Sequence, residues 1–331
     1  MNAFTPAMQP SGRKALIVGV TGQDGAYLAA HLLARGYEVF GSSRDARPSS
    51  LYGLRFLGIA DRVQVVQMIP SDFRSVIQTI SAIGPDEIFN LSGQSSVAVS
   101  FSQPMETLES VIVATANLLE AIRFLGLEST TRFYNASSSE CFGNTEGTPA
   151  NEHTPFHPNS PYAVAKASAY WLVANYRSAY GLFACSGILF NHESPLRPDR
   201  FVTRKIVAAA VRIADGSTER LRLGNIDIAR DWGWAPEYVD AMHRMLQIDE
   251  PRDIVVATGR TVRLSYFIEH AFAQLGLDWG RHVDSDSTLL RPSDIEISRA
   301  DPSLASSVLN WQATVNVETV ISRLIENERD V

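Results

Sequence analysis

The chain has 331 residues, of which 45% are hydrophobic, 20% charged and 9% aromatic. This composition is typical of a globular protein and excludes a disordered or collagen-like chain. The 29 Lys and Arg residues are outnumbered by 36 Asp and Glu, which gives a net charge of −7. A chain of that charge repels phosphate polymers, so nucleic acid is not expected as a partner.

Two features bear on the compartment. Cys141 and Cys185 are the only cysteines, too few for a disulfide framework or a cysteine-rich zinc site, which favours the reducing cytoplasm. Residues 1–13 lack the apolar segment of a signal peptide and are expected to form a flexible tail. No run approaches the about 18 to 20 apolar residues of a membrane span, so a membrane is not expected as a partner.

From residue 14 onward, strand and helix patterns alternate. Apolar β-rich runs occur at 14–20, 37–43, 63–68, 87–92, 132–139 and 184–190, and helical spacing occurs at 27–35, 72–83, 107–125 and 162–180. Alternation of this kind predicts right-handed βαβ crossovers and an α/β fold with a doubly wound parallel sheet.

The second half has a different composition. Pro- and Arg-rich loops are expected around 195–204, a strand at 219–225, and helices near 235–247 and 264–275. We therefore expect a dinucleotide-binding Rossmann domain at 14–190. A smaller domain at 191–331, mainly for substrate binding, is expected to be interleaved with it.

Gly19, Gly22 and Gly25 fall where the first strand turns into the first helix. Glycines there let backbone amides approach a pyrophosphate at a helix N-terminus. A helix-capping turn with incidental glycines is the alternative for the triplet alone. Its place in the first βα turn of an alternating pattern favours dinucleotide binding.

The tip of the second strand bears on cofactor choice. An acid about 20 residues past the last glycine indicates NAD, and an arginine indicates NADP. This sequence has both, as Arg44 and Asp45, with Arg47 close by. Two guanidiniums could hold a 2′-phosphate, so NADP is favoured over NAD. The alternative is that these charges only solvate an exposed loop.

Tyr162 and Lys166 are four residues apart in a predicted helix, which places them on one face. There the ammonium can stabilise a phenolate, so that the tyrosine can act as a base. Such a pair is common by chance in helices. It becomes specific because it follows a strand that ends in serines, among them Ser138, and then Glu140.

Several stretches together resemble one known family. They are residues 18–25, 160–166, 187–195, 201–205 and 230–233. Over about residues 14–328 the chain is similar to the extended short-chain dehydrogenase/reductase superfamily and, within it, to the GDP-mannose 4,6-dehydratase family. The resemblance implies a hydro-lyase that uses NADP, converts GDP-mannose to GDP-4-keto-6-deoxymannose without net redox change, and forms a homodimer or homotetramer.

The resemblance also implies roles for particular residues. Tyr162 would take the O4 proton with help from Lys166, Ser138 would hydrogen-bond O4, and Glu140 would be the C5 base and then help water to leave. The implied cofactor-binding residues are Gly19, Thr21, Gly22, Gln23, Asp24, Gly25, Arg44, Arg47, Leu91, Gly93, Gln94, Ser95, Tyr162, Lys166, His192 and Arg197. The implied substrate-binding residues are Ser95, Asn191, Val202, Lys205, Leu223, Arg230, Arg291 and Asp294.

Some positions depart from the family, and other functions stay open. Residues 68–72 replace the usual Gly-Asp-Leu-Thr-Asp, whose first aspartate meets adenine. The alternatives are a dehydratase for another GDP-sugar such as GDP-heptose, a GDP-4-keto-6-deoxyhexose reductase or epimerase, and a non-catalytic dinucleotide sensor. His153 and His157 have no cysteine partners nearby, so no metal is expected.

Overall fold

The computed structural model describes residues 12–44, 47 and 51–330. Asp45 and nearly all of the predicted tail lie outside these residues. The chain forms two compact units. Unit 1 contains the described residues up to Ser138, Ser160–Ile188 and Val239–Ile254, and unit 2 contains Ser139–Asn159, Leu189–Tyr238 and the described residues from Val255 onward. The chain therefore passes back and forth between the units.

A seven-stranded sheet has the order β10-β6-β5-β4-β1-β2-β3. Its strands are β1 (Lys14–Val18), β2 (Glu38–Ser43), β3 (Gln64–Gln67), β4 (Glu87–Asn90), β5 (Arg132–Ser138), β6 (Ala184–Leu189) and β10 (Ile254–Val256). The pairs β3–β2, β2–β1, β1–β4 and β4–β5 are all parallel. The predicted doubly wound α/β fold is confirmed, and the chain reverses its direction of winding between β1 and β4.

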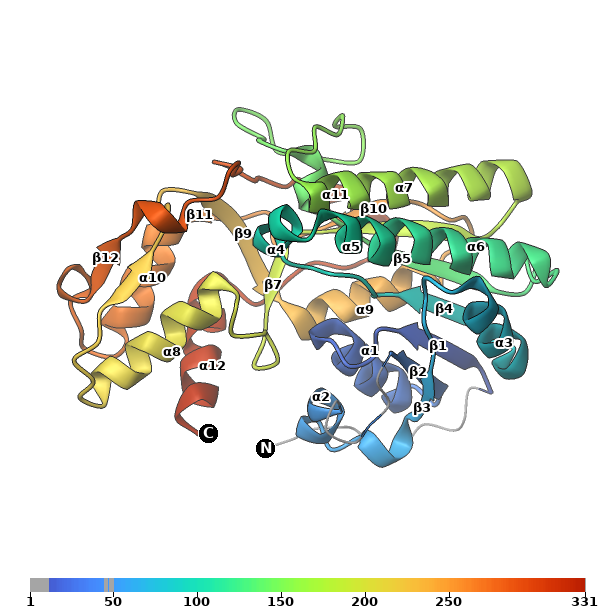
Figure 1. Ribbon diagram of the computed structural model, residues 1–331, viewed down its shortest axis with the longest axis horizontal. Coiled ribbons are helices and arrows are strands. Elements are labelled where there is room, and N and C mark those ends of the chain that lie inside the picture. The colour runs from blue at the N-terminus through green and yellow to red at the C-terminus, as the bar shows by residue number, and fades with distance from the viewer. Residues whose placement is uncertain (1–11, 45–46, 48–50, 331) are drawn as a thin grey trace. The chain divides into compact units, whose positions relative to one another are not determined.

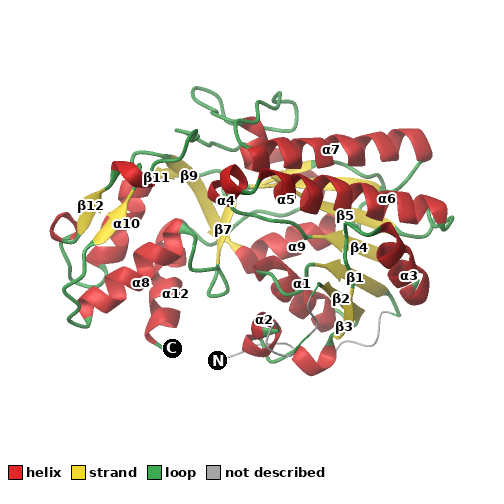
Figure 2. Ribbon diagram, in the orientation of Figure 1, coloured by secondary structure: helices red, strands yellow, loops and turns green. Residues whose placement is uncertain are grey.

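Helices cover both faces of this sheet (Figures 1 and 2). They are α1 (Gln23–Ala34), α2 (Tyr52–Phe56), α3 (Phe73–Ile83), α4 (Val97–Ser102), α5 (Pro104–Leu108), α6 (Ala114–Phe124), α7 (Pro161–Tyr180) and the C-terminal part of α9 (Ala235–Met245), with a 3-10 turn at Ala60–Arg62. On the face of α3, α6 and α7, buried Ile80, Leu118 and Val173 pack with Leu16 and Ile88 of the strands. This contiguous apolar cluster is the core of unit 1.

Local sequence explains several helix ends. Asp72 caps α3 by accepting from the Arg74 N–H at 3.0 Å, and Gly84 ends the helix at φ +59°. The first helix begins at Gln23, four residues before the predicted start at 27. The single helix predicted over 107–125 is instead α5, a π turn η3 (Glu109–Val113) and α6. Apolar spacing cannot reveal one extra residue in a turn, so the π segment was not expected.

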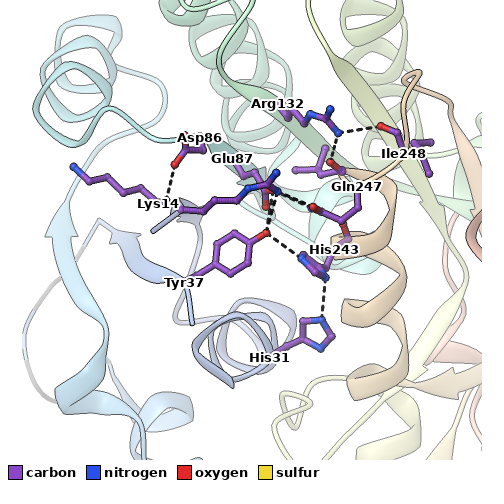
Figure 3. A network of polar contacts seen from close by, with 11 residues as sticks. Lys14, His31, Tyr37, Asp86, Glu87, Arg132, His243, Gln247 and Ile248 are labelled. Atoms are coloured by element: carbon purple, nitrogen blue, oxygen red, sulfur yellow. Dashed lines mark hydrogen bonds and ion pairs between the residues drawn. The ribbon is translucent and has the colours of Figure 1, made fainter. Parts of the chain in front are cut away.

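A polar network lies at the amino-terminal ends of β2 and β4 (Figure 3). Buried Glu87 at the start of β4 accepts hydrogen bonds from Arg13, Tyr37 and Gln247, all at its Oε1, at 3.0, 3.1 and 2.9 Å. The Tyr37 hydroxyl also meets His243 Nε2 at 3.2 Å. These contacts attach the C-terminal part of α9 to the sheet within unit 1.

Unit 2 has smaller sheets and its own core. Its strands are β7 (Asn191–Glu193), β8 (Leu221–Leu223), β9 (Ala229–Trp234), β11 (Thr261–Arg263) and β12 (Val283–Ser285); β9 pairs with β7 and β11, and β8 with β12. Its helices are α8 (Val202–Ala214), α10 (Leu264–Ala273), α11 (Ser303–Leu309), α12 (Val317–Arg329) and 3-10 turns at Ser139–Phe142 (η4), Trp279–Arg281 and Ser287–Leu289. Ile206, Phe267, Ile321 and Trp232 meet in its core.

Two expectations for this half were wrong in extent. The loop region predicted over 195–204 ends at Phe201, because α8 begins at Val202, and the strand predicted over 219–225 is only Leu221–Leu223. The apolar face of α8 starts just beyond the Pro- and Arg-rich stretch, which obscured its N-terminus. None of the helices in the described ranges is long and apolar enough to cross a membrane.

Candidate functional site

The turn after β1 requires glycine at two positions. Gly19 adopts φ +93°, and a Cβ there would lie 3.1 Å from the Leu91 carbonyl oxygen. A Cβ on Gly25 would lie 2.3 Å from the Gly19 oxygen and 2.7 Å from Val20 Cα. Since these neighbours are backbone atoms, the close packing of strand, turn and helix depends on both glycines.

The same turn begins α1. Gly22 is its N-cap in extended conformation, no side chain caps the helix, and Gln23 and Asp24 form its first turn with Thr21 just before it. Unsatisfied amides at a helix start favour an anion, and the helix dipole adds to this. The residues present therefore fit a dinucleotide pyrophosphate.

The two arginines expected to select the cofactor are both exposed. Arg44 follows directly on β2, and Arg47 lies three residues beyond. Asp45, between them, is outside the described residues.

The segment 91–96 after β4 lies against this turn, and we call it the β4 loop. Leu91 N–H donates to Val18 O at 2.9 Å. Gly93 has φ +116° and, like Ser95, is exposed. Gln94, an expected cofactor contact, has side-chain hydrogen bonds to Ser96 and Thr107.

Three of the expected catalytic residues belong to unit 1. Tyr162 and Lys166 lie on α7, which Ser160 caps by accepting from Ala163 N–H at 3.1 Å. Lys166 Nζ donates to Ala136 O of β5 at 2.7 Å and lies 5.9 Å from the centre of the Tyr162 ring. Ser138 ends β5 and is buried, as are Tyr162 and Lys166. The structure thus ties the tyrosine–lysine helix to the strand of Ser138.

The fourth, Glu140, lies in η4 of unit 2, two residues along the chain from Ser138. Burial raises the pKa of its carboxyl above the usual range, while the Arg230 and Arg291 guanidiniums oppose that rise and the Asp294 carboxylate adds to it. Buried Arg230 donates to Asp294 Oδ1 at 3.2 Å, and Arg291 lies 3.5 Å from the same atom. Glu140, Arg230, Arg291 and Asp294 therefore form one charge cluster within unit 2.

The other expected substrate residues are distributed over unit 2. Asn191 begins β7 and is half-buried, and Val202 and exposed Lys205 lie in the first turn of α8. Leu223 is buried in the core of this unit. Its side chain therefore packs inside the protein, and only its backbone remains for a ligand.

Two expected cofactor residues of unit 2 are held by neighbours. His192 Nδ1 donates to Phe190 O at 2.7 Å, and its ring stacks on Tyr238 with centroids 4.5 Å apart. Arg197 lies 3.7 Å from the centre of the Phe201 ring, and its Nε is 3.3 Å from Glu193 Oε2.

Sequence reasoning missed two buried acids of unit 2. Glu193 also accepts from Thr203 Oγ1 at 2.7 Å. Asp231 accepts from Thr258 N–H at 3.0 Å and Oγ1 at 2.9 Å, and burial raises its pKa to about 6. One signal for them lies in the sequence, which is their place next to expected site residues. Glu193 follows His192, and Asp231 follows Arg230.

The chemistry of the residues described above is of three kinds. The glycine turn can bind a dinucleotide, the Tyr162 phenol can move a proton at an oxygen, and the Glu140 carboxylate can remove a proton from carbon. The described residues include no group of three or more His, Cys, Asp or Glu side chains placed to hold a metal ion.

Comparisons with known proteins agree with this chemistry. A family model described as GDP-mannose 4,6 dehydratase matches residues 16–324. The chain is 42% identical to a GDP-mannose 4,6-dehydratase of Vibrio cholerae, over 96% of this chain and 94% of the relative. It is 43% identical to GDP-mannose 4,6 dehydratase 2 of Arabidopsis thaliana, over 96% and 87%.

Solved structures share the fold. A dTDP-glucose 4,6-dehydratase from Bacillus anthracis in complex with NAD has a TM-score of 0.83 at 17% identity, over 96% of this chain and 97% of that one. A protein named RMD from Pseudomonas aeruginosa, complexed with NADPH, has a TM-score of 0.78 at 20% identity, over 98% and 99%.

Proposed function

The chain belongs to the GDP-mannose 4,6-dehydratase family, and from this membership we propose that it converts GDP-mannose to GDP-4-keto-6-deoxymannose with loss of water. The observation that carries the proposal is the state of Glu140. A carboxyl whose pKa is raised by burial, beside two guanidiniums and just after the strand of Ser138, suits a base that must later act as an acid.

A nicotinamide cofactor held at the glycine turn and the β4 loop would supply reversible hydride transfer, first at C4 of the sugar and then at C6. Tyr162 accepts the O4 proton, and Ser138 hydrogen-bonds O4. The Lys166 ammonium, held by its bond to Ala136 O, stabilises the phenolate. We propose that the same ammonium also binds a ribose hydroxyl of the cofactor.

Glu140 acts once C4 is a ketone, because only then is the C5 proton acidic. The carboxylate removes that proton and, now protonated, gives it to the departing 6-hydroxyl, which leaves as water. Hydride addition at C6 is completed by a proton at C5, and the proton that Tyr162 took from O4 balances it. The raised pKa of Glu140 makes its carboxylate a stronger base, and it lets the carboxyl keep the proton between its removal from C5 and its transfer to the 6-hydroxyl.

For the cofactor we propose NADP, held by the glycine turn and the β4 loop. The titles of solved neighbours name NAD or NADPH, which supports a nicotinamide dinucleotide. Exposed Arg44 and Arg47 favour NADP, since guanidiniums bind a 2′-phosphate well. His192 and Arg197 are further proposed cofactor contacts.

For the substrate we propose that Asn191, Lys205, Arg230 and Arg291 bind the GDP moiety, since cations suit a diphosphate. The binding residues expected from the resemblance, Ser95, Val202, Leu223 and Asp294 among them, remain part of this proposal. GDP-heptose, which the sequence leaves open, is the second candidate substrate.

The test is to incubate the pure protein with GDP-mannose and to follow the product mass and cofactor absorbance. We expect a product lighter by one water with no net NADPH change. Net consumption of NADPH would indicate a reductase instead, and no mass loss with GDP-mannose or GDP-heptose would refute the proposal.

The matched variant is Glu140→Gln, which removes the base and keeps the shape. Dehydration should fall at least about 1000-fold, on the scale of a lost general base, while NADPH and GDP binding stay near wild type. Retained dehydration would show that Glu140 is not the base.

We also propose a homodimer or homotetramer. Four apolar side chains are exposed on the adjacent segments α5, η3 and α7, namely Met105 (74%), Val113 (41%), Val164 (43%) and Trp171 (62%). Val164 and Trp171 are seven residues apart on α7 and share a face. Exposed apolar side chains on neighbouring elements favour association. The compartment we propose is the cytoplasm, supported by the buried thiols of Cys141 and Cys185.

A further inference from the structure

The β4 loop lies at the reversal point of the sheet, between β1 and β4. Parallel α/β sheets bind their ligands at the carboxyl ends of strands where the winding reverses. A Cβ on Gly19 would lie 3.1 Å from the Leu91 oxygen and 3.2 Å from Ser92 Cα. The binding of a ligand at the glycine turn therefore depends on the position of the β4 loop.

The π turn η3, with Ser110, and the end of α5, with Thr107, hold the loop from one side. Ser110 Oγ accepts from the Gln94 backbone N–H at 3.2 Å and donates to Thr107 O at 3.3 Å. Thr107 Oγ1 accepts from Gln94 Nε2 at 3.1 Å and donates to Gln103 O at 2.8 Å. Two hydroxyls thus fix one loop residue through its backbone and its side chain.

The Gln94 side chain uses both of its Nε2 protons and accepts one further hydrogen bond. Its Nε2 also donates to Ser96 O at 2.8 Å, and its Oε1 accepts from Ser96 N–H. Gln94 is therefore placed to shape the loop, with exposed Ser95 between its two anchored neighbours.

The fit between loop and π turn is close. A Cβ on Gly93 would lie 2.8 Å from Val111 Cγ2 and 3.2 Å from Ser110 O. Val111 is itself buried against Ala165 and Ala169 of α7. Ala165 directly precedes Lys166, so the same turn contacts the helix of the proposed catalytic pair.

We propose that the π turn sets the position of the β4 loop for dinucleotide binding, with Ser110 and Thr107 as positioning residues and Gln94 acting through the loop rather than as a ligand contact. This inference rests on the proposed function only in that the ligand is a nicotinamide dinucleotide. A π turn supplies the extra backbone residue that brings Ser110 and Val111 together against the loop, and such turns are frequent at functional sites.

The test is to titrate Ser110→Ala with NADPH and, separately, with GDP. We expect NADPH binding about fivefold weaker, the scale of one net hydrogen bond, with unchanged GDP affinity and a melting temperature near that of wild type. Ser178→Ala is the matched control, because Ser178 makes the same kind of hydroxyl bond to the carbonyl three residues earlier, at 3.1 Å, on an exposed part of α7. Ser110→Thr keeps the hydroxyl and should restore NADPH affinity.

Unchanged NADPH affinity in Ser110→Ala, or an equal loss of GDP affinity, would overturn the inference. A cycle of Thr107→Val and Gln94→Met separates positioning from direct contact. Positioning predicts that each variant weakens NADPH binding and that the double variant is no weaker than the worse single one. If Thr107→Val is silent while Gln94→Met weakens binding, Gln94 touches the ligand and the inference is wrong.

The wild type distinguishes this inference from the proposed function. If it binds NADPH but removes no water from GDP-sugars, the dehydratase proposal fails and the positioning result stands by itself. If it does not bind NADPH, both fail.

Discussion

The charge state of Glu140 depends on three neighbours in unit 2. Burial raises the pKa of the carboxyl, and the Arg230 and Arg291 guanidiniums favour the carboxylate. Asp294 disfavours it directly, and it also accepts a hydrogen bond from Arg230. The pKa of Glu140, the proposed base, is therefore shifted by a carboxylate that need not touch the sugar.

We predict that Asp294→Asn moves the acid limb of the kcat–pH profile to lower pH. Two effects have the same sign: removing the Asp294 charge lowers the pKa of Glu140, and Arg230, without its anionic partner, favours the Glu140 carboxylate more strongly. The measurement is single-turnover dehydration from about pH 5 to 8, the span in which a raised carboxyl pKa matters. Asp284→Asn, an exposed carboxylate paired with Arg220 at 2.6 Å on β12, is the control. An acid limb that stays in place or moves to higher pH would exclude this tuning.

At the residue scale, the sequence predicted those groups of residues that lie within a few positions of one another along the chain. The spacing of Tyr162 and Lys166 along one helix, and the Gly19, Gly22 and Gly25 triplet, report geometry that the backbone fixes within a few residues. The bonds of Gln94 run to Thr107 and Ser110, 13 and 16 residues away. No local pattern encodes such a pairing, so its role required the structure.

At the element scale, α1 and the C-terminal part of α9 meet through two imidazoles (Figure 3). His31 Nε2 lies 3.4 Å from His243 Nδ1, and burial, with nearby arginines, lowers the pKa of His31 to about 2 and of His243 to about 4. Both pKa values lie below the usual value near 6.5 for an unfolded chain. The unfolded state therefore binds protons first as the pH falls.

We predict that the free energy of unfolding falls as the pH drops from about 6.5 to 4.5, and that His31→Gln makes this fall shallower. Because stability rises with pH wherever the unfolded state holds more protons, one such histidine contributes a slope of up to about 1.4 kcal/mol per pH unit. The measurement is urea unfolding at several pH values, taken as variant minus wild type. This difference cancels the opposite contribution of Glu87, whose pKa is raised by burial.

His153→Gln is the control, since His153 is exposed on a loop. It should leave the pH dependence of unfolding as in wild type. A His31→Gln protein with the wild-type slope would show that this imidazole does not stay neutral in the folded state.

Elements with strong apolar periodicity and clear caps were predictable, and those shaped by contacts were not. Asp72, Ser160 and Gly84 act on their own helices, and their effect is visible in the sequence. The π turn within 107–125 depends on packing against Gly93 and α7. The three-residue strands β7, β11 and β12 are too short to carry a periodic signal.

At the scale of the whole molecule, two cores form from an interleaved chain. The sheet core of unit 1 and the helical core of unit 2 each draw on residues from distant parts of the sequence. The sequence predicted a boundary near residue 190. It could not predict that 139–159, before that boundary, belongs to unit 2, or that 239–254, after it, belongs to unit 1. The Pro-, Gly- and Asn-rich composition of 139–159 indicates a loop, but it does not indicate the unit to which that loop belongs.

The exposed apolar face of α5, η3 and α7 should form the contact between copies. We predict that Trp171→Glu weakens self-association about 100-fold or more, because each copy would bury an unpaired carboxylate in an apolar contact. The measurement is the molar mass by light scattering over a dilution series. Leu289→Glu places the same charge at an exposed leucine of unit 2, 53% accessible, and should keep the wild-type mass. If Trp171→Glu keeps the wild-type mass at every concentration, the contact between copies lies on another surface. If both variants lose mass, the cause is a general effect of the added charge.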